Sequence, residues 1–431
     1  MRLSTAMLAS LLMGSPLLAA ERPANVILVS IDTLRADHLG CSGYRRETSP
    51  AIDRFRRDSI LFTQAIAQAP STLVSHASLL TSLWPHEHGA SERRHRALPP
   101  DALTLAEVLR SHGFATLSYN GGGQIDPVFG LGQGFDTYRT RDEHDFAAAV
   151  APAIAWIDRN PGRRFFLFLH TYEVHHPYTP DATHRRLFEA SYAGPLPDAI
   201  TIEVLQSIND GRMTLGVADL EHVIAAYDAE IRSVDDDFAA LLEFLVRRGL
   251  YDETLIVFTS DHGEEFGEHG RVGWHSHTLY DELLRVPLIV KLPGSRHAGA
   301  TVTQQVRSID VPTTILAVLD LPVPASFRGI DLVPLARGEP VAALPAVAMQ
   351  DGGDAVVLRT ERWKLYGDIL HDLEQDPHEV RDAASGNADV AARLRVELGR
   401  MLGAPRAGSG APAARPDART LERLRSLGYV H

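Results

Sequence analysis

The sequence of 431 residues contains a single cysteine, Cys41. One cysteine cannot form an intramolecular disulfide, and it cannot build a metal site from several thiolates. Cys41 lies between Leu39 and Tyr44 among small and polar residues, a pattern typical of a loop in which a small side chain packs. We therefore interpret Cys41 as structural, with a free thiol nucleophile as the alternative.

Positive charge is also scarce. The chain carries 42 lysines and arginines against 55 aspartates and glutamates, which gives a formal net charge of -13 at pH 7. A protein with this acidic balance repels the phosphate backbone of nucleic acids, so broad nucleic-acid binding is excluded. With 45% hydrophobic residues, the chain is nevertheless long and apolar enough to bury a large core.

Long hydrophobic runs are missing as well. Near the N-terminus, Arg2 is followed by two apolar runs, residues 6–13 and 17–20, which are too short and too broken for a membrane span. A basic residue followed by such a stretch is typical of a secretory signal peptide. We therefore expect residues 1–20 to be removed, the protein to be periplasmic or secreted, and no transmembrane segment to remain. A buried N-terminal helix is the alternative, but the strand-like pattern begins only at Asn25.

Five short apolar runs recur along the chain, with segments of helical length between them. Continuous apolar strands that alternate with helices are typical of a mostly parallel sheet covered on both faces. We therefore predict an α/β fold with a mostly parallel central sheet flanked by helices. The expected strands are residues 26–31, 115–119, 165–169, 254–259 and 287–290, and the expected helices include residues 104–112, 146–159 and 221–248. Three adjacent aspartates, at 235–237, point in different directions around the last helix, so we expect a solvated face there.

The composition changes toward the C-terminus. From Ala346 on, the apolar runs are short and strand-like, whereas residues 403–419 are rich in alanine, proline and glycine. We predict a catalytic α/β domain over residues 25–335 and a small C-terminal β-rich subdomain over residues 340–395. A flexible linker and a terminal helix are expected over residues 403–431.

Polar side chains follow four of the expected strands, at the point where each strand ends. These residues are Asp32, Asn120, His170 and the pair Asp261 and His262. Ligand sites in open α/β sheets lie at the carboxyl ends of the strands. We therefore expect these side chains to surround one common site.

Hydroxyls and a histidine open a helix-like run at residues 69–81. The run starts with a proline and a serine, which are tolerated or favoured at a helix start, and its apolar residues recur with helical spacing. This spacing places Thr72, Ser75 and His76 on one face, with the Thr72 hydroxyl at the electropositive end. Such a terminus binds anions, and an adjacent metal can turn a hydroxyl into a nucleophile. An ordinary capped core helix is the alternative.

The densest cluster of chemically versatile residues lies at positions 260–277, which hold four of the chain's 20 histidines. Asp261 and His262 offer a carboxylate oxygen and an imidazole nitrogen to one cation, and nearby glycines let the loop turn tightly. Asp32 is the natural third ligand, and Thr72 is a candidate for the fourth. Any one of these residues can instead cap a turn, but clustered Asp, His and Gly pack a core poorly.

A third group of residues, 170–178, follows the apolar strand at 165–169 and contains three histidines. Imidazoles at this edge of the sheet can donate hydrogen bonds to an anion or protonate a leaving oxygen. We favour a functional role for His175. For His176, a structural role in the loop is an equally good interpretation.

With these residues assembled, the chain resembles the sulfatase family of the alkaline phosphatase superfamily. The similarity extends from about residue 25 to about residue 389, and it is carried by residues 25–40, 261–263, 267–270, 279–287, 310–313 and 370–377. The resemblance implies a catalytic α/β domain with a small C-terminal sheet domain. It also implies one divalent metal and cleavage of sulfate or phosphate esters through a covalent enzyme intermediate.

The resemblance also implies roles for individual residues. Asp32, Asp261 and His262 match the family's metal ligands. The family's nucleophile motif, which is Cys or Ser followed by any residue, Pro, Ser and Arg, falls on residues 72–76. Thr72 therefore takes the nucleophile position.

Two basic positions of the family's active site are matched by histidines. His175 fits the histidine that follows the central strand. His275 or His277 lies near the basic residue that follows the second metal segment.

The chain departs from the family pattern at several positions. Thr72 replaces the Cys or Ser that sulfatases oxidise to formylglycine, His76 replaces the arginine, and Thr33 replaces the second aspartate of a metal pair. Residues 120–122 lie where many members have a lysine and a histidine. Loss of one oxygen ligand, with His262 retained, shifts the expected metal from calcium toward zinc or manganese, with calcium or magnesium as alternatives.

Three functions follow as hypotheses. A metal-bound threonine alkoxide resembles the nucleophile of the superfamily's phosphoethanolamine and glycerol-phosphate transferases, so we favour a metal-dependent hydrolase or transferase of phosphate mono- or diesters. In this hypothesis Thr72 forms a phospho-threonine, and the histidines steady the nonbridging oxygens or serve the leaving group: His76, His175, and His275 or His277. The second hypothesis is a sulfatase that works without formylglycine, and the third is a noncatalytic metal-binding relative. The expected substrate is a small-molecule, lipid-linked or glycan-linked phosphate or sulfate ester.

Overall fold

The computed structural model describes residues 25–141, 144–189, 191–403 and 411–429. The predicted signal peptide, residues 1–20, lies outside the described residues, and so do residues 404–410 of the predicted linker. None of the described helices is both long and apolar enough to cross a membrane.

A nine-stranded sheet forms the centre of the described chain, in the order β10-β2-β9-β6-β1-β5-β3-β4, with β11 also paired to β2. All its strand pairs are parallel except those of β9, which runs antiparallel to both β2 and β6. The predicted α/β fold with a mostly parallel sheet is therefore confirmed. The strands are β1 Asn25–Ile31, β2 Ile60–Ile66, β3 Ala115–Asn120, β4 Thr137–Thr140, β5 Phe165–Thr171, β6 Thr254–Ser260, β9 Arg285–Lys291, β10 Thr301–Val302 and β11 Val306–Arg307.

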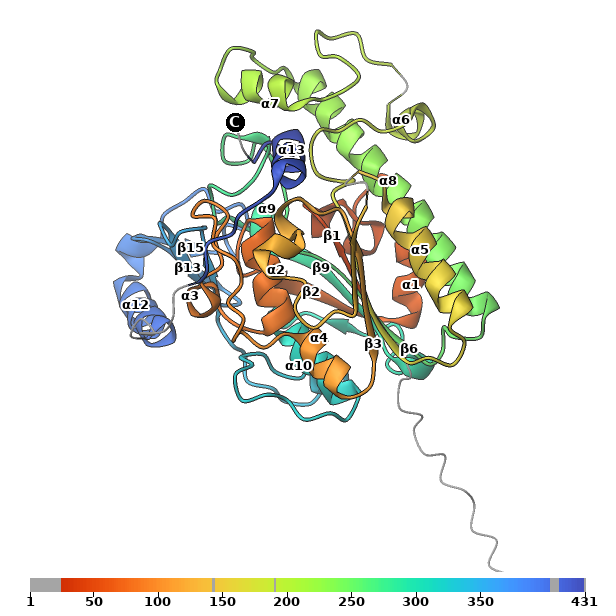
Figure 1. Cartoon of the computed structure of the whole chain (residues 1–431). Helices are drawn as coiled ribbons and strands as arrows, with labels where there is room; N and C mark the ends of the chain where they lie inside the picture. The colour runs from red at the N-terminus through yellow and green to blue at the C-terminus, as the bar shows by residue number, and fades with distance from the viewer. Residues whose placement is uncertain (1–24, 142–143, 190, 404–410, 430–431) are drawn as a thin grey trace, which may run out of the picture.

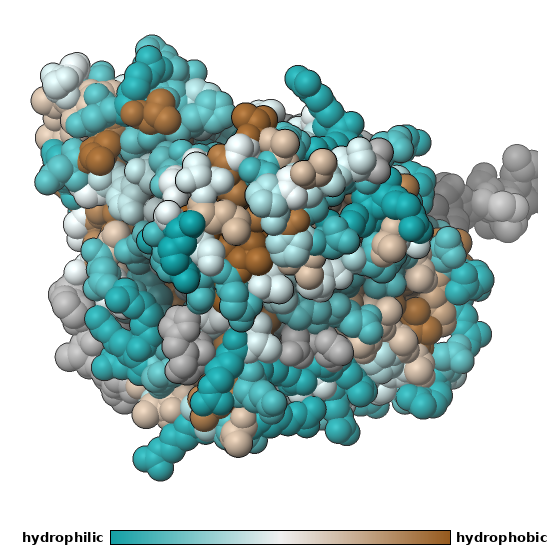
Figure 2. Space-filling view, turned by 90° about the horizontal axis from the view of Figure 1, so that it is seen from above, coloured by the Kyte–Doolittle hydropathy of each residue, from teal (hydrophilic) through white to brown (hydrophobic). Residues whose placement is uncertain are grey.

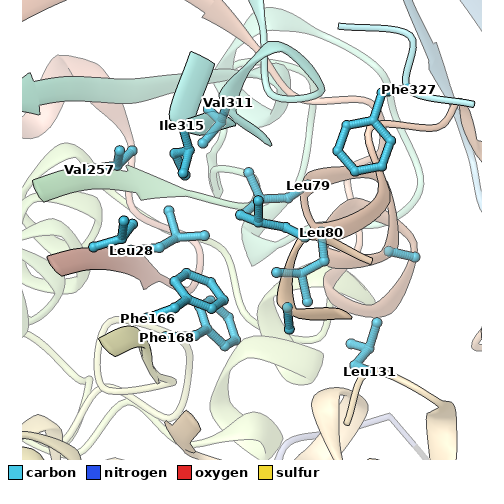
Figure 3. Packing of buried hydrophobic residues seen from close by; sticks show 14 of the residues in the cluster. Leu28, Leu79, Leu80, Leu131, Phe166, Phe168, Val257, Val311, Ile315 and Phe327 are labelled. Atoms are coloured by element: carbon cyan, nitrogen blue, oxygen red, sulfur yellow. The ribbon is translucent and has the colours of Figure 1, made fainter. Parts of the chain in front are cut away.

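Helices cover both faces of this sheet (Figure 1). One face packs against α2 Thr72–Thr81, α4 Leu105–Ser111 and α10 Asp310–Val318, and the other against α1 Pro50–Phe55, α5 Phe146–Arg159 and α8 Val217–Arg247. Alternate residues of β1 serve the two cores, because successive side chains of a strand point to opposite faces: Leu28 lies in one core and Val29 in the other. Figure 3 shows Leu28 with Leu79 of α2 and Ile315 of α10 in the first core.

A smaller antiparallel sheet follows, in the order β12-β13-β14-β15, with its strands at Ala346–Met349, Val356–Arg359, Trp363–Tyr366 and Ile369–Asp372. The predicted small β-rich part is present, and α12 Ala388–Leu402 packs on it. The other elements are α3 Pro85–His88, α6 Ala182–Phe188, α7 Ile202–Asn209, β7 Glu265–Phe266, β8 Val272–Trp274, α9 Asp281–Leu284, α11 Val333–Ala336 and α13 Ala418–Ser426.

The expectation on helix α8 is wrong for one of its three adjacent aspartates, whereas Asp236 is exposed as expected. The aspartates at 235–237 were expected on a solvated face, but Asp235 is fully buried. Its carboxylate accepts hydrogen bonds from the backbone N–H groups of Ala51 at 2.8 Å and Ile52 at 2.7 Å. The first turn of α1 has N–H groups without partners in its own helix, and an aspartate from the neighbouring helix satisfies two of them.

An ion-pair network joins the small sheet to the main domain. Lys364 of β14 contacts Asp281 of α9 at 3.0 Å and Glu379 at 2.7 Å, and Arg359 of β13 contacts Asp281 at 2.7 Å. Lys364 is fully buried. Burial alone would raise the pKa of Asp281, but Arg359 and Lys364 hold that pKa well below its usual range. The network therefore holds α9, and the loop that precedes it, against the small sheet.

Replacement of Asp281 by asparagine tests this network. Asp281→Asn leaves two cationic side chains short of a buried counter-charge, so we expect the free energy of unfolding to fall by about 3 kcal/mol, measured by denaturant titration. The matched control is Asp389→Asn, which removes an exposed i,i+4 pair with Arg393 and is expected to cost less than about 0.5 kcal/mol. Equal effects of the two substitutions would contradict the role of the network.

Candidate active site and metal centre

The start of helix α2 lies at the carboxyl edge of the central sheet. Ser71 precedes the helix with an extended backbone, at φ -149° and ψ 145°, and every residue of α2 is buried. Ser71 does not cap the helix through its side chain; the carboxyl of Glu92 accepts the N–H of Leu73 at 2.6 Å instead. Further along, the Ser75 hydroxyl donates to the carbonyl of Asp261 at 2.7 Å, which ties the helix to the end of β6.

Thr72 is the first residue of α2, and its hydroxyl faces the strand ends. The Oγ1 atom lies 3.2 Å from Asp32 Oδ2, at the end of β1, and 3.4 Å from His262 Nε2, just after β6. Thr72 is completely buried. The structure therefore brings together Thr72, Asp32, Asp261 and His262, all four of the predicted metal-site residues.

The two carboxylates of this group are poorly compensated. Asp32 and Asp261 follow neighbouring parallel strands and are buried. Burial raises the pKa of Asp32 to about 7, although the nearby His262 opposes the shift, and burial also raises the pKa of Asp261. Among the described residues, no donor forms a hydrogen bond to Asp32 Oδ1 or to Asp261 Oδ2. Buried carboxylate oxygens with no donor need another positive partner.

These residues fit a divalent metal ion. Asp32, Asp261 and His262 each offer one ligand atom, and these atoms lie within 4.8 Å of one another. His262 Nδ1 lies 2.9 Å from the carbonyl of Gly263, so Nδ1 carries the proton and Nε2 presents its lone pair to the cluster. The Thr33 hydroxyl donates instead to the backbone carbonyl of Asp32 at 2.8 Å. The cluster therefore offers two carboxylates, one imidazole and one hydroxyl.

His76 lies behind Thr72, one helical turn further along α2. Its Nδ1 is 2.8 Å from the carbonyl of Thr72 and 3.4 Å from Asp261 Oδ2, and its Nε2 is 3.0 Å from the Ser30 hydroxyl. Burial lowers the pKa of His76 to about 4, so the ring is neutral at pH 7. Both ring nitrogens contact protein groups. His76 therefore helps to hold Thr72 and Asp261 in place.

The predicted histidines after β5 and β8 lie at different depths. The rings of His175 and His275 are 4.9 Å apart, and His275 is 4.6 Å from the His262 ring. His275 Nδ1 lies 3.0 Å from Glu264 Oε1. His277 is partly exposed, and its Nε2 lies 3.8 Å from Glu265 Oε2. His275 therefore lies beside the metal-site residues, whereas His277 lies closer to the protein surface.

A cavity of about 400 Å³ opens beside the cluster. His176, His275 and His277 line one part of it, and Glu92, Gln124 and Tyr429 line others. The face of the molecule that carries α13 is predominantly hydrophilic (Figure 2). A polar substrate fits such a cavity better than an apolar one does.

Sequence reasoning gave no role to three residues that touch this cluster. His170 was noted only as a strand-end residue, and its Nε2 lies 3.2 Å from Asp32 Oδ2. Ser30 contacts His76, and Tyr429 contacts Thr72 at 2.8 Å. The position of His170 at a strand end was a usable signal for it, but no local pattern marks Ser30 or Tyr429.

Comparison with known proteins identifies the family. A family model described as Sulfatase matches residues 24–321. The chain belongs to the sulfatase family. A second model, described as N-sulphoglucosamine sulphohydrolase, C-terminal, matches residues 267–403 of this sulfatase-family chain.

Relatives and solved structures agree with this family. The multifunctional alkaline phosphatase superfamily protein PehA of Trinickia caryophylli is 26% identical, over 86% of this chain and 93% of PehA. A protein solved in complex with its substrate D-glucosamine-2-N,6-O-disulfate has a TM-score of 0.73 at 20% identity, over 88% of this chain and 97% of its own. The phosphonate monoester hydrolase of Agrobacterium radiobacter has a TM-score of 0.72 at 21% identity, over 91% and 100%. The chain is a sulfatase-like ester hydrolase, and members of its family are generally metal-dependent.

His170 offers a test of the metal centre. In His170→Phe, Asp32 loses the imidazole that orients its carboxylate, so we expect the affinity for Zn²⁺ or Mn²⁺ to fall by about 10- to 100-fold. Isothermal titration calorimetry on the metal-free protein measures this change. The control is His184→Gln, at a half-buried histidine that pairs with Asp236, for which an unchanged dissociation constant is expected. An unchanged affinity in His170→Phe would place the metal elsewhere.

Proposed function

We propose that this sulfatase-family chain hydrolyses phosphate monoesters or diesters, or transfers their phosphoryl group, with Thr72 as the nucleophile. The observation that carries the proposal is the Thr72 hydroxyl, 3.2 Å from Asp32 and 3.4 Å from His262 at the first turn of a buried helix. A threonine cannot be converted to the formylglycine on which sulfatases of this family rely. An intact hydroxyl beside a metal site suits direct attack on phosphorus.

The metal site supports this chemistry. A divalent ion held by Asp32, Asp261 and His262 supplies positive charge for the phosphoryl oxygens and lowers the pKa of a neighbouring hydroxyl. A ligand set with an imidazole, and with Thr33 in place of a carboxylate, favours zinc or manganese over calcium or magnesium.

The reaction follows from the groups around Thr72. Thr72 attacks phosphorus in line, the bond to the leaving oxygen breaks, and a phospho-threonine forms. Burial lowers the pKa of His275 to about 4, so its ring is neutral at pH 7, and its Nδ1–H is directed at Glu264. His275 Nε2 therefore presents a lone pair that can accept a proton from the water that hydrolyses the phospho-threonine.

Sulfate-ester hydrolysis is the second candidate. The match to the sulfatase model, and the fold shared with a protein bound to a glucosamine disulfate, favour it. The names of two other relatives, a phosphonate monoester hydrolase and a multifunctional superfamily protein, favour phosphorus esters. Under either candidate, the polar cavity and the predicted signal peptide favour a small-molecule, glycan-linked or lipid-linked ester met outside the cytoplasm.

Substitution of Thr72 tests the nucleophile. Thr72→Ala removes the attacking oxygen, so we expect kcat/KM for an aryl phosphate to fall at least about 10³-fold, whereas Thr72→Ser keeps the oxygen and most of the activity. The assay panel contains aryl phosphates, phosphodiesters, phosphonates and sulfates with defined metals. Unchanged hydrolysis in Thr72→Ala would refute the nucleophile, and sulfate turnover far above all phosphorus esters would favour the second candidate.

Metal removal gives an independent test. Treatment with a chelator is expected to abolish turnover, because Thr72 then loses the charge that activates it, and added zinc or manganese is expected to restore turnover better than calcium. Recovery with calcium alone would contradict the proposed preference.

A further inference from the structure

The segment of residues 411–429, here called the C-terminal segment, lies over the active site. In Figure 1, its helix α13 (dark blue) lies above α2 and α9. Its first part pairs with the loop after α3: Ala97 N–H donates to the carbonyl of Pro412 at 2.8 Å, and Ala414 N–H donates to that of His95 at 2.6 Å. The segment is therefore tied to the main domain before it reaches the site.

Two leucines anchor the end of this segment. Leu424 and Leu427 are buried, and Leu424 belongs to the core on the α2 face of the sheet. The chain after β3 leaves room for Leu427, because a Cβ atom at Gly123 would lie 2.7 Å from Leu427 Cδ1. Leu427, Gly428 and Tyr429 then form one wall of the cavity of about 400 Å³.

The proposed nucleophile is shut off from that cavity. Thr72 is completely buried and lines no part of the cavity. Its Oγ1 atom lies 3.2 Å from Asp32 and 3.4 Å from His262 on the metal side, and 2.8 Å from the Tyr429 hydroxyl. Because Tyr429 contacts Thr72 and also lines the cavity, its phenol separates the nucleophile from the space in which a substrate fits.

The same hydroxyl also contacts His175, the histidine after β5. Its oxygen lies 3.2 Å from His175 Nε2. His175 Nδ1 lies 2.5 Å from the carbonyl of His176, which can only accept, so Nδ1 carries the proton and Nε2 is an acceptor. The Thr72 hydroxyl donates to Asp32, so its lone pairs are acceptors as well. One phenolic hydroxyl therefore lies between two acceptors that a bound ester has to reach.

Attack on phosphorus requires this hydroxyl to move. Reacting atoms have to approach to about 3–3.5 Å, and the Tyr429 oxygen already lies within that distance of Thr72 Oγ1. Because Thr72 is completely buried, no other side of its oxygen is open. A phosphoryl group therefore reaches Thr72 only after the phenol has moved away.

We propose that the C-terminal segment closes the active site, and that Tyr429 and the substrate compete for one place beside Thr72 and His175. The inference rests on the function proposed above. Closure of this kind acts as an intramolecular competitive inhibitor. It lowers the fraction of molecules that can bind an ester, and the apparent affinity falls by that fraction. Once the ester is bound, the phenol has left and the rate of the reaction is unaffected.

Removal of the phenol tests this closure in the full chain, loaded with its metal. Tyr429→Ala exposes Thr72 to the cavity, so we expect KM for the ester that the wild-type protein turns over fastest to fall at least about tenfold, with kcat within about threefold of wild type. The matched control is Tyr251→Ala, which removes a phenol that donates to Asp58 at 3.1 Å and should leave both constants unchanged. A loss of kcat in Tyr429→Ala, or an unchanged KM, would overturn the proposal.

A second variant loosens the segment without a change in the site itself. Leu424→Ala removes an anchor of α13, so the closed form is less populated and we expect KM to fall at least about threefold. The matched control is Leu394→Ala, at a buried leucine of α12 that packs on the small sheet, and its KM should equal that of wild type. Thermal unfolding of each variant shows that it is folded. Equal KM values in the two leucine variants would count against the closure.

Binding of inorganic phosphate gives a measurement that does not depend on turnover. By isothermal titration calorimetry on the protein loaded with zinc, we expect phosphate to bind Tyr429→Ala at least about tenfold more tightly than wild type. Equal dissociation constants would refute the closure. If Thr72→Ala leaves hydrolysis unchanged while phosphate binds Tyr429→Ala more tightly, the nucleophile fails and the closure stands. If Thr72→Ala abolishes turnover while Tyr429→Ala changes neither KM nor the affinity for phosphate, the closure alone fails.

Discussion

The burial of two neighbouring carboxylates, Asp32 and Asp261, is the constraint on which the candidate site depends. Asp32 and Asp261 are held close together because they end neighbouring parallel strands, β1 and β6, and each strand is completely buried. Among the described residues, no lysine or arginine pairs with either carboxylate; the charged partners are the imidazoles of His170, His76 and His262. Burying two carboxylates costs a large free energy of desolvation unless a cation neutralises them. The start of α2 places Thr72 and the residues that contact it next to these two carboxylates.

Much of this arrangement can be predicted from the sequence. Continuous apolar runs indicate strands that are buried on both faces. A polar residue directly after such a run lies at the edge of the sheet where ligands bind. This rule grouped Asp32, Asp261 and His262 from the sequence alone. Strand β2 escaped prediction because its apolar pattern is interrupted by Thr63 and Gln64, at a point where its register with β9 shifts. The antiparallel direction of β9 depends on how the chain connects it to β6. The spacing of apolar residues within a strand carries no information about that connection.

Other features depend on contacts between distant segments. Asp235 is buried because α1 packs across α8 and needs a cap, and nothing in the local pattern of α8 records that neighbour. Tyr429 reaches Thr72 from 357 residues away, at the end of a segment whose sequence predicts a linker and a helix but no contact with the candidate site. His170 lies between these cases: its place at a strand end was visible, but its partner Asp32 became identifiable only through the pairing of β1 with β5.

The contact between Thr72 and Tyr429 joins two residues that are 357 positions apart in the sequence. Contacts at such sequence separation are costly to form early, because loop closure must be compensated by interactions that come later. The sheet and its helices can be complete while the pocket still lacks this wall. The pocket wall is therefore completed late in folding, when two segments that lie 357 residues apart have met.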